Sequence, residues 1–527
     1  MSVLKTILPF SRKDSIFTFW LVLLFFFVSL IGILNHEVWL DEIQAWLIAR
    51  DSTSIVDLFR NLRYEGHPGL WHLNLYFISR ITHNPTAMQL FHLIIATINI
   101  YVFVKFSPFN KLHKVLFTFS YFPFYEYSII SRNYNLGILF IFLFCKFFPT
   151  RKKSYFILAS LLSILANTNV YSFIISICLF LTLIVDFISN SYFLENFRYR
   201  IKNILISFAI LLFGYAVALL QIIPPADAKF TGSTQNFGES NNLINTIKHL
   251  SYVLMTVWRS YVPLPNFLED HFWNTNLLIE GAGSLRVIAL FFSLILLIFS
   301  IVIFIRKPIV LFLYTSGTFG ILLFTYTKFS GYLRHHGHLF ILLIACLWLT
   351  SYYPRRYTQR GLPKFTHFFT KYKYQILTTI LYVHVLASVF AFSMDLIHPF
   401  SASKEVAQFI KSQQLDNKLI VGSKDYAVAP ISALLDRQLF YLESNNLGSF
   451  ISWNQREDLN ETEFIQRLHS VVTQNNTPIL LILNYALYDQ AYKMFNISPL
   501  FQSSQSIVHG ENYYLYSLTN KHTALKK

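Results

Sequence analysis

The sequence predicts an all-α polytopic membrane protein that ends in a small extracytoplasmic α/β domain. Of its 527 residues, 54% are hydrophobic and only 13% are charged, whereas soluble domains carry roughly 25% charged residues. The apolar residues form blocks long enough to cross a bilayer as helices, such as 16–34, 204–220 and 287–305. The basic residues gather in the short segments between these blocks, as expected of cytoplasmic loops.

The basic segments also predict the order and direction of the spans. The first block, 16–34, follows Lys5, Arg12 and Lys13, and we interpret it as an uncleaved anchor with a cytoplasmic N-terminus. If the later basic segments are cytoplasmic too, the chain has about eleven transmembrane helices and an external C-terminus. The other ten are expected at 87–105, 113–128, 133–148, 154–167, 170–188, 203–221, 284–305, 309–326, 338–352 and 376–394.

Three segments lie outside the cytoplasm in this topology: a first outer loop, 35–86, a later outer loop, 222–284, and the tail, 395–527. Within the first loop, 69–81 is too short and too polar to span, so we expect an interfacial amphipathic helix there. The tail alternates helical patterns with short apolar runs, which indicates a small α/β domain. The helices are expected at 403–413 and 461–472, and the strands at 418–422, 478–484 and 513–517. The chain thus divides into a transmembrane module, 1–394, and an α/β domain, 395–527.

The charge distribution argues against nucleic acid as a partner. The net charge is +16, but the tail carries 11 basic and 12 acidic residues, so the excess belongs to the loops of the membrane module. The three cysteines lie inside apolar blocks and form neither a disulfide framework nor a metal-binding spacing. The sequence contains no phosphate-binding loop and no dinucleotide fingerprint, so chemistry driven by ATP or NAD is not expected.

The polar residues of the first outer loop are the strongest candidates for chemistry. The stretch 39–42 (Trp-Leu-Asp-Glu) follows closely behind the first span, so Asp41 and Glu42 are expected at the membrane surface. A second polar stretch, 62–68 (Leu-Arg-Tyr-Glu-Gly-His-Pro), follows in the same loop. On spacing alone, a solvated loop whose acids pair with Arg50 and Arg63 is an equally good interpretation.

These stretches resemble the first periplasmic loop of the GT-C glycosyltransferases, membrane enzymes that take a sugar from a polyprenyl-phosphate carrier. The superfamily includes protein O-mannosyltransferases and lipid A aminoarabinose transferases. The segment 125–137 is similar to their second outer loop, and 332–337 is similar to a stretch in bacterial members. The resemblance covers about residues 16–350 and is expected to extend to the tail. It implies a GT-C-like fold, a polyprenyl-phosphate-linked sugar donor, an extracytoplasmic acceptor and a first-loop aspartate as general base, which is Asp41 here.

A single base suffices for that reaction. A glycosidase needs a second carboxyl group as an acid, because its leaving group is an alkoxide. A sugar carried on polyprenyl phosphate instead releases a phosphate, whose second pKa is about 6, so it leaves without a proton. Asp41 would deprotonate the acceptor hydroxyl, while Glu42 would orient Asp41 or the acceptor. Direct displacement would invert the anomeric carbon.

Cations near the same membrane surface are expected to bind the donor phosphate. We assign this role to Arg132, with Tyr134 close to it, and to the cluster Arg334, His335 and His336, since an arginine fork matches phosphate oxygens. Charged residues at membrane boundaries are rare and usually functional. The alternatives are that Arg132 reaches lipid head groups and that the histidines are hydrated loop residues.

Glu65, His67 and Arg63 are expected to support the substrate site. In the aminoarabinose transferases the corresponding glutamate helps to hold a metal. A divalent metal could bind Glu65 and His67, with Glu269, Asp270 or His271 of the later loop as further ligands. The sequence has no Asp-x-Asp motif, however, and Glu65 could equally pair with Arg63. The metal is therefore left unassigned, and the sequence requires no cofactor.

The sequence thus predicts an inverting glycosyltransferase in a bacterial plasma membrane, in contact with membrane lipids. Its acceptor would be a glycolipid, a polysaccharide or a protein. One alternative is an O-antigen-ligase-like or polymerase-like enzyme, which would rely on Arg and His residues of a late outer loop. Another is a transporter or flippase for lipid-linked sugars, which would expose charged residues at mid-bilayer depth.

Overall fold

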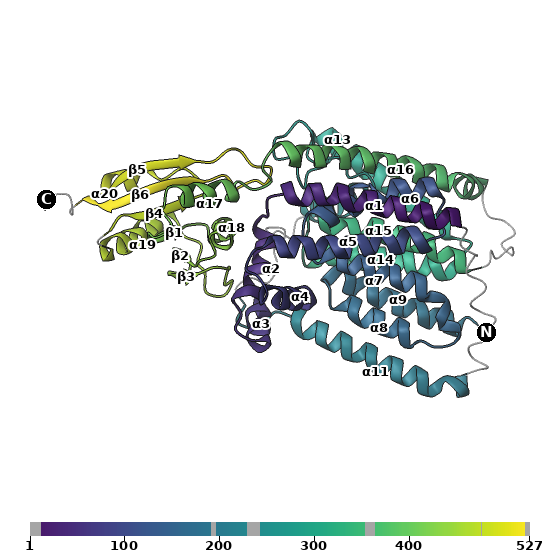
Figure 1. Cartoon of the computed structure of the whole chain (residues 1–527). Helices are drawn as coiled ribbons and strands as arrows, with labels where there is room; N and C mark the ends of the chain where they lie inside the picture. The colour runs from purple at the N-terminus through teal and green to yellow at the C-terminus, as the bar shows by residue number, and fades with distance from the viewer. Residues whose placement is uncertain (1–11, 191–196, 229–242, 354–363, 476, 522–527) are drawn as a thin grey trace.

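A computed structural model of the chain describes residues 12–190, 197–228, 243–353, 364–475 and 477–521. A long helical bundle carries a small α/β domain at one end, and the first helix, α1 (Arg12–Asn35), begins at the other end (Figure 1). Three parts of the sequence-based topology lie outside the described residues: Lys5, the basic stretch 354–363 and part of the later loop, 229–242.

Eight helices in the described part of the chain are long and apolar enough to cross a membrane. Their outer faces expose many large apolar side chains, including Trp20, Phe213 and Phe291, as expected for contact with lipid. The helices are α1 (Arg12–Asn35), α5 (Thr86–Phe106), α9 (Val170–Ile188), α11 (Phe197–Ile222), α13 (Gly283–Phe304), α14 (Pro308–Thr327), α15 (Leu333–Leu349) and α16 (Lys364–Ile397).

The other three predicted spans are shorter than a bilayer crossing of about 20 residues. The span expected at 113–128 is divided between α6 (Lys111–Thr118) and a π-helical segment, Tyr121–Ile129, because Ser120 is extended between them. The spans expected at 133–148 and 154–167 are α7 (Tyr134–Phe147) and α8 (Phe156–Ala166). The π-helical segment is buried throughout, so its apolar character reflects the protein core rather than lipid contact.

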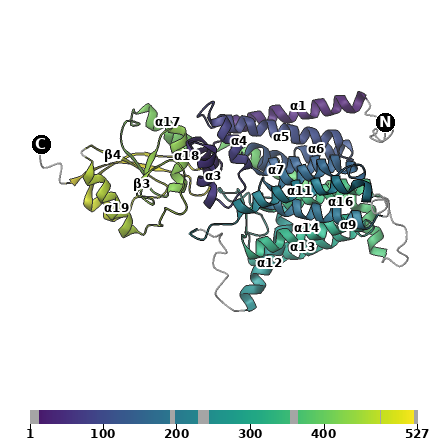
Figure 2. The ribbon, with the colours of Figure 1, turned by 90° about the horizontal axis from the view of Figure 1, so that it is seen from below.

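The first loop is mostly helical. It contains α2 (Leu40–Asp51), α3 (Ile55–Asn61), a short 3₁₀ turn (Leu62–Tyr64) and α4 (Leu70–Ser79). The helix expected within 69–81 is therefore confirmed as α4. The later loop also contains a helix that the sequence did not predict, α12 (Leu243–Tyr261), which packs on α13 and α15. These helices lie at the end of the bundle next to the α/β domain (Figures 1 and 2).

The α/β domain has one six-stranded sheet of order β3-β2-β1-β4-β6-β5. Strand β1 pairs in parallel with β2 and β4, and the other pairs are antiparallel. The predicted helices and strands of the tail are all present. The elements are α17 (Ser403–Ser412), β1 (Ile420–Gly422), α18 (Asp425–Leu435), β2 (Leu439–Tyr441), β3 (Asn446–Gly448), α19 (Glu461–Gln474), β4 (Ile479–Leu483), α20 (Asp489–Met494), β5 (Phe495–Gln502) and β6 (Tyr514–Asn520).

One edge of this sheet faces the bundle. The carboxyl ends of β1, β2 and β4 lie there together with the start of β6, because Leu483 pairs with Tyr514 in the antiparallel ladder. The segments 449–453 and 503–513 contact the first loop, for example through the hydrogen bonds of Ile451 with Gln44 and of Glu511 with Leu40. Ala429 and Ala433 of α18, with Ile507 and Val508, belong to the same buried cluster as the helices of the bundle. The two parts of the molecule therefore share one core.

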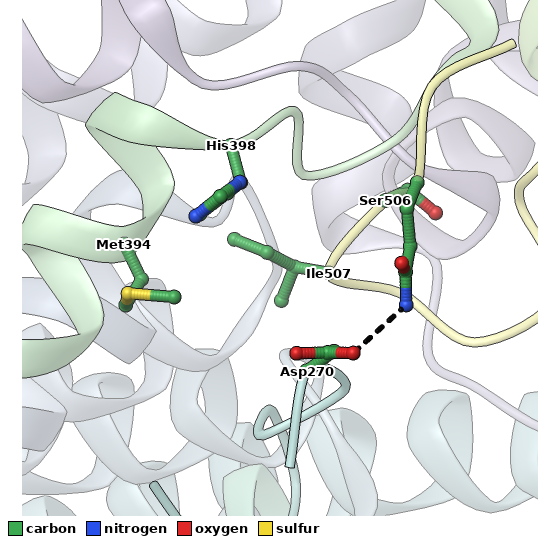
Figure 3. Close-up of a pocket in the computed structure, with 6 residues that line it drawn as sticks. Asp270, Met394, His398, Ser506 and Ile507 are labelled. Atoms are coloured by element: carbon green, nitrogen blue, oxygen red, sulfur yellow. Dashed lines mark hydrogen bonds between the residues drawn. The ribbon is translucent and has the colours of Figure 1, made fainter. Parts of the chain in front are cut away.

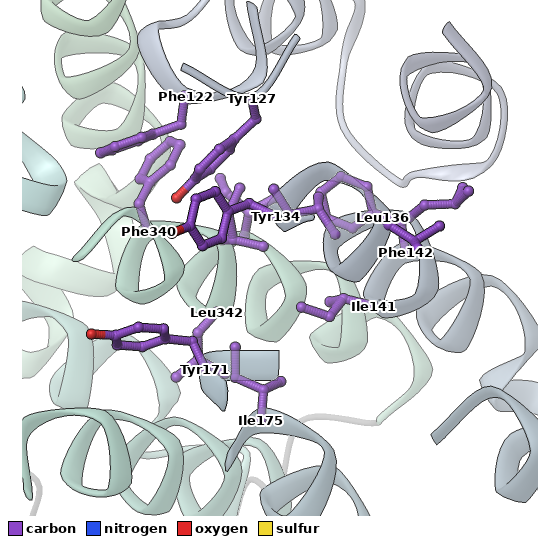
Figure 4. Close-up of a cluster of buried hydrophobic side chains, with 14 of the residues drawn as sticks. Phe122, Tyr127, Tyr134, Leu136, Ile141, Phe142, Tyr171, Ile175, Phe340 and Leu342 are labelled. Carbon is purple, nitrogen blue, oxygen red and sulfur yellow. The ribbon is translucent and has the colours of Figure 1, made fainter. Parts of the chain in front are cut away.

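Helix α15 runs through the centre of the bundle. All of its residues are buried, and they pack against α7, α9, α12 and α14. Tyr134 of α7 and Tyr171 of α9 lie over it, next to Phe340 and Leu342 of α15 itself (Figure 4). The close fit fixes the position of the N-terminal end of α15, which carries three of the candidate site residues, Arg334, His335 and His336.

Candidate active site

The structure brings together three residues that the sequence separates by almost 300 positions. A carboxylate oxygen of Asp41 lies 2.9 Å from a guanidinium nitrogen of Arg334 and 3.6 Å from one of Arg132. Arg132 also donates to the backbone carbonyl of Asp41. The two arginines are 7% and 13% exposed, whereas the Asp41 side chain is 27% exposed and so remains open on one side. A carboxylate thus meets two positive charges at the junction of the bundle and the α/β domain.

Arg334 occupies the first turn of α15. Its guanidinium lies over the rings of Trp39 and Trp273, 5.2 Å from each ring centre, and 4.7 Å from that of Tyr332. Aromatic faces attract a guanidinium, most strongly where water is excluded. The backbone carbonyl of Arg334 accepts from the hydroxyl of Tyr127 at 2.6 Å. Arg334 is therefore fixed both by its backbone and by its side chain.

Glu42, the neighbour of Asp41, does not point into the same space. Its side chain is fully buried, and it accepts hydrogen bonds from the backbone N–H groups of Trp39 and Ser131. The bond to Trp39 belongs to the capping box of α2, and the bond to Ser131 connects α2 to the residue before Arg132. Glu42 thus holds the backbone around Asp41 and Arg132, and it faces away from solvent.

Of the predicted histidines, His335 contacts the site most directly. Its Nε2 lies 2.9 Å from the hydroxyl of Tyr134, and its Nδ1 accepts from the backbone N–H of Tyr332 in a capping box at the start of α15. His336 Nε2 lies 2.9 Å from the carbonyl oxygen of Ser330. His338, also buried, has its Nδ1 at the carbonyl oxygen of His335. These contacts make the histidines part of the packing that supports Arg334.

Glu65 lies between the first loop and the α/β domain. It accepts hydrogen bonds from Gln44 at 2.8 Å and from the indole N–H of Trp453 at 3.0 Å. Burial raises the pKa of this carboxyl to about 7. Arg63 is exposed, and the hydroxyl of its neighbour Tyr64 donates to Asp227. The structure therefore pairs Glu65 with neutral donors and not with Arg63.

His67 is close enough to the site to be influenced by its charges. Burial, reinforced by the positive charge of Arg132, lowers the pKa of its imidazole to about 4. Its Nδ1 is buried without a hydrogen-bond partner among the described residues. His67 is thus a neutral group that presents an unused ring nitrogen.

The possible metal ligands do not form a centre. Among residues 12–190, 197–228, 243–353, 364–475 and 477–521, no three His, Cys, Asp or Glu side chains lie close enough to hold a metal ion. Asp270 and His271 instead contact Gln505 and the carbonyl oxygen of Ile507 in the α/β domain. We therefore derive no step through a metal.

Two polar residues that the sequence analysis did not identify support Asp41. Glu511 of the α/β domain accepts from the backbone N–H of Leu40 at 2.9 Å, at the N-terminus of α2, and burial raises the pKa of its carboxyl to about 8. His36 lies behind Glu42, within 3.1 Å of it. No local motif could have identified Glu511, because it is 471 residues away from Leu40 in the sequence.

A small cavity lies beside this site rather than within it. Its lining comes from three segments that meet at the junction: Asp270 of the later loop, Met394 and His398 near the end of α16, and Gln505–Ile507 of the α/β domain (Figure 3). The side chain of Gln505 donates to Asp270 across it. None of Asp41, Arg132 and Arg334 lines this cavity, so the cavity and the three charged residues are separate features of the junction.

The fold has a solved counterpart. It resembles the crystal structure of ArnT from Cupriavidus metallidurans bound to undecaprenyl phosphate, with a TM-score of 0.50 over 96% of this chain and 98% of ArnT. The two sequences are only 11% identical. No protein-family model and no curated protein matches the sequence. The likeness shows that the chain has a GT-C-like fold, as the motifs of the first loop predicted.

Proposed function

We propose that this protein is an inverting glycosyltransferase that moves a sugar from a polyprenyl-phosphate carrier to an acceptor outside the cytoplasm. The observation that carries the proposal is the contact of Asp41 with Arg132 and Arg334 at one end of an apolar helical bundle. The fold gives independent support, because ArnT, which shares it, was crystallised with undecaprenyl phosphate. The sugar and the acceptor are not specified by these residues.

The two arginines are the proposed binding site for the donor phosphate. Arg334 stands in the first turn of α15, where backbone N–H groups and the helix dipole also favour an anion. Arg132 approaches from the turn before α7. As the bond between sugar and phosphate breaks, negative charge grows on the phosphate, and two fixed guanidinium groups stabilise it. The departing phosphate needs no acid, which agrees with the presence of a single exposed carboxylate between the arginines.

Asp41 is the proposed general base. It is the most exposed of the three charged groups, so an acceptor hydroxyl can reach it. Attack on the anomeric carbon forms the new glycosidic bond and breaks the bond to the phosphate oxygen, while the hydroxyl proton passes to Asp41. The tail residues Glu511 and Trp453 reach the same region through Leu40 and Glu65. We place the acceptor between the first loop and the α/β domain.

The first test compares wild-type protein with Asp41→Asn on a panel of undecaprenyl-phosphate-linked sugars. We expect Asp41→Asn to reduce transfer by roughly 10²–10⁴-fold, the usual contribution of a general base, and to keep its affinity for the carrier. Asp57→Asn is the matched control, because Asp57 lies in the same loop with a similar exposure of 25%. Wild-type turnover by Asp41→Asn would refute the proposed mechanism.

The second test examines the phosphate site. Arg334→Lys keeps the positive charge but loses the two-pronged guanidinium, so we expect the affinity for undecaprenyl phosphate to fall by about tenfold. Arg151→Lys is the control, because Arg151 is also buried against a carboxylate, that of Asp186, at the far end of α7. Equal losses of affinity in both variants would show that Arg334 acts through general packing.

A further inference from the structure

His36 is enclosed between two carboxylates at the point where the first span ends. Its Nδ1 lies 2.8 Å from a carboxylate oxygen of Asp395 on α16, and its Nε2 lies 3.1 Å from one of Glu42 on α2. The imidazole is fully buried, with the ring of Phe400 at 4.4 Å, and the carbonyl of His36 accepts from the side chain of Gln89. Residues of α2, α5 and α16 therefore all contact His36.

The geometry determines the charge of this imidazole. An ionised carboxylate can only accept a hydrogen bond, so both ring nitrogens of His36 must carry a proton to satisfy Asp395 and Glu42 together. The result is an imidazolium ion between two carboxylates. Burial alone would lower the pKa of His36, but the two carboxylates outweigh it and raise the pKa to about 10. Glu37, Glu126 and His92 also lie within electrostatic reach of the ring.

The effect of this cation reaches the proposed site through Glu42. One oxygen of Glu42 faces His36 and the N–H of Trp39, and the other accepts from the N–H of Ser131. Trp39 precedes the helix that carries Asp41, and Ser131 precedes Arg132. Without a cation beside it, Glu42 would be a buried charge next to a second one, Asp395, and such uncompensated charges are strongly destabilising.

We propose that His36 is a positioning residue that, as an imidazolium, holds Glu42 in place and thereby fixes the relative positions of Asp41 and Arg132. The inference rests on the proposed function for its catalytic consequence, since His36 itself touches neither Asp41 nor an arginine. Asp395, near the end of the last span, takes part in this arrangement because it contacts the same imidazolium ion. If His36 acted only by filling space, the shape of the side chain at position 36 would decide the position of Glu42. Our inference predicts instead that the positive charge of the imidazolium decides it.

The experiment uses the full-length protein in detergent and has two readouts. His36→Gln keeps a polar side chain but removes the cation, and His36→Gln/Asp395→Asn also removes one of the two facing charges. His113→Gln is the matched control, because His113 likewise connects to α16, through Thr378, but lies outside the site. The first readout is hydrogen–deuterium exchange of residues 39–43 and 130–133. The second is the rate of sugar transfer.

We expect His36→Gln to speed exchange of both segments by at least about tenfold, since Trp39 and Ser131 lose a fixed acceptor. Its kcat should fall by about 10–100-fold, the scale of a small misplacement of reacting groups, while the KM for the donor changes by less than about threefold. The kcat of the double variant should be at least about fivefold higher than that of His36→Gln, because the Asp395 charge, which would lack a partner in the single variant, has been removed.

Three results would overturn the inference. They are unchanged exchange in His36→Gln, an equal effect of His113→Gln on the two segments, and a double variant as impaired as the single one. The exchange measurement needs no donor. If wild-type protein transfers no sugar from any carrier, the proposed function fails, while exchange in the same two segments still decides the role of His36. If His36→Gln does not fold, exchange is compared instead between the double variant and Asp395→Asn. These two proteins differ only at position 36, so the comparison still tests the role of His36.

Discussion

Glu65 illustrates how a single buried carboxyl makes stability depend on pH. Burial raises its pKa from 4.5 to about 7, so the folded protein still holds the proton at pH values where the unfolded chain has released it. The free energy of unfolding therefore decreases as pH rises from about 4.5 to about 7, and the loss is complete above that range. Gln44 and Trp453 both donate to one oxygen of Glu65. This oxygen can accept their hydrogen bonds whether or not the carboxyl group is ionised.

Glu65→Gln should therefore stabilise the protein at alkaline pH. The amide keeps an oxygen for both donors but cannot ionise, so we expect a gain of roughly 1–3 kcal/mol at pH 8 and little change at pH 5. Thermal unfolding in detergent between pH 5 and pH 8 measures this difference. The exposed Glu461, at the start of α19, provides the control substitution. A variant that is less stable than wild type at pH 8 would contradict the prediction.

Residue types and motifs in the sequence were sufficient to select Asp41, Arg132 and Arg334, and the structure brings these three together. The sequence could not show that Glu42 faces inward, because adjacent residues of a helix point about 100° apart and either could face the acceptor. It also could not identify Glu511, since only the folded sheet places that residue at the N-terminus of α2. Long-range contacts of this kind leave no local pattern.

At the scale of elements, the crossing of α15 with the π-helical segment leaves no room for a side chain at Gly337. A Cβ atom added at Gly337 would lie 2.3 Å from the hydroxyl of Tyr127 and 2.6 Å from the ring of Phe122. Both residues belong to the π-helical segment, and Tyr127 also donates to the carbonyl of Arg334. The crossing of α15 with the π-helical segment therefore has no room for a residue larger than glycine at position 337.

Gly337→Ala should lower stability by about 1–3 kcal/mol, the usual result of overpacking a core. It should also weaken donor binding, because α15 must move away from Tyr127 and carries Arg334 with it. Gly283, at the start of α13, has nothing within 4 Å of an added Cβ atom, so Gly283→Ala is the control. Melting temperatures and carrier affinity of the two variants provide the comparison. Equal stability of both would show that α15 relaxes without cost.

Element boundaries were predicted well for several long, strongly apolar blocks and less well for the block 113–128. The long helices α1, α5, α9 and α13 lie close to the expected ranges. The block 113–128 is rich in Phe and Tyr but also contains His113, Lys114 and Glu126, and it folds as α6 and a π-helical segment inside the bundle. Hydropathy reports how apolar a segment is and not what surrounds it, so buried and lipid-exposed segments look alike in the sequence.

At the scale of the whole molecule, the bundle and the α/β domain are continuous. Ala429 of α18 is fully buried in the core that includes α2, whereas Ala407 of α17 is buried in a core confined to the α/β domain. The sequence predicted α17, α19, β1, β4 and β6 of this domain, but it did not predict α18, which packs on α2. It left the role of the domain as a guess, because the sheet edge that meets α2 is formed only in the assembled structure.

The contrast between these two alanines tests the connection. Ala429→Leu and Ala407→Leu add the same volume to a buried position, so both should lower the melting temperature through overpacking, at a cost of about 1–3 kcal/mol. Only Ala429→Leu should also reduce the rate of sugar transfer per folded molecule, because it displaces α2 and Asp41. Transfer assays normalised to folded protein make the comparison. A similar loss of rate in both variants would mean that the two cores are not separate.

The ion pairs of Asp41 have a consequence for the order of events in a catalytic cycle. Without donor, the carboxylate that should accept a proton is engaged by the cations that should bind phosphate. Under the proposed mechanism, an incoming phosphate would compete with Asp41 for both guanidinium groups, so arrival of the lipid carrier would release the base. We therefore expect sequential kinetics in which the lipid carrier binds before the acceptor. We also expect that Asp41 does not activate water while the carrier is absent.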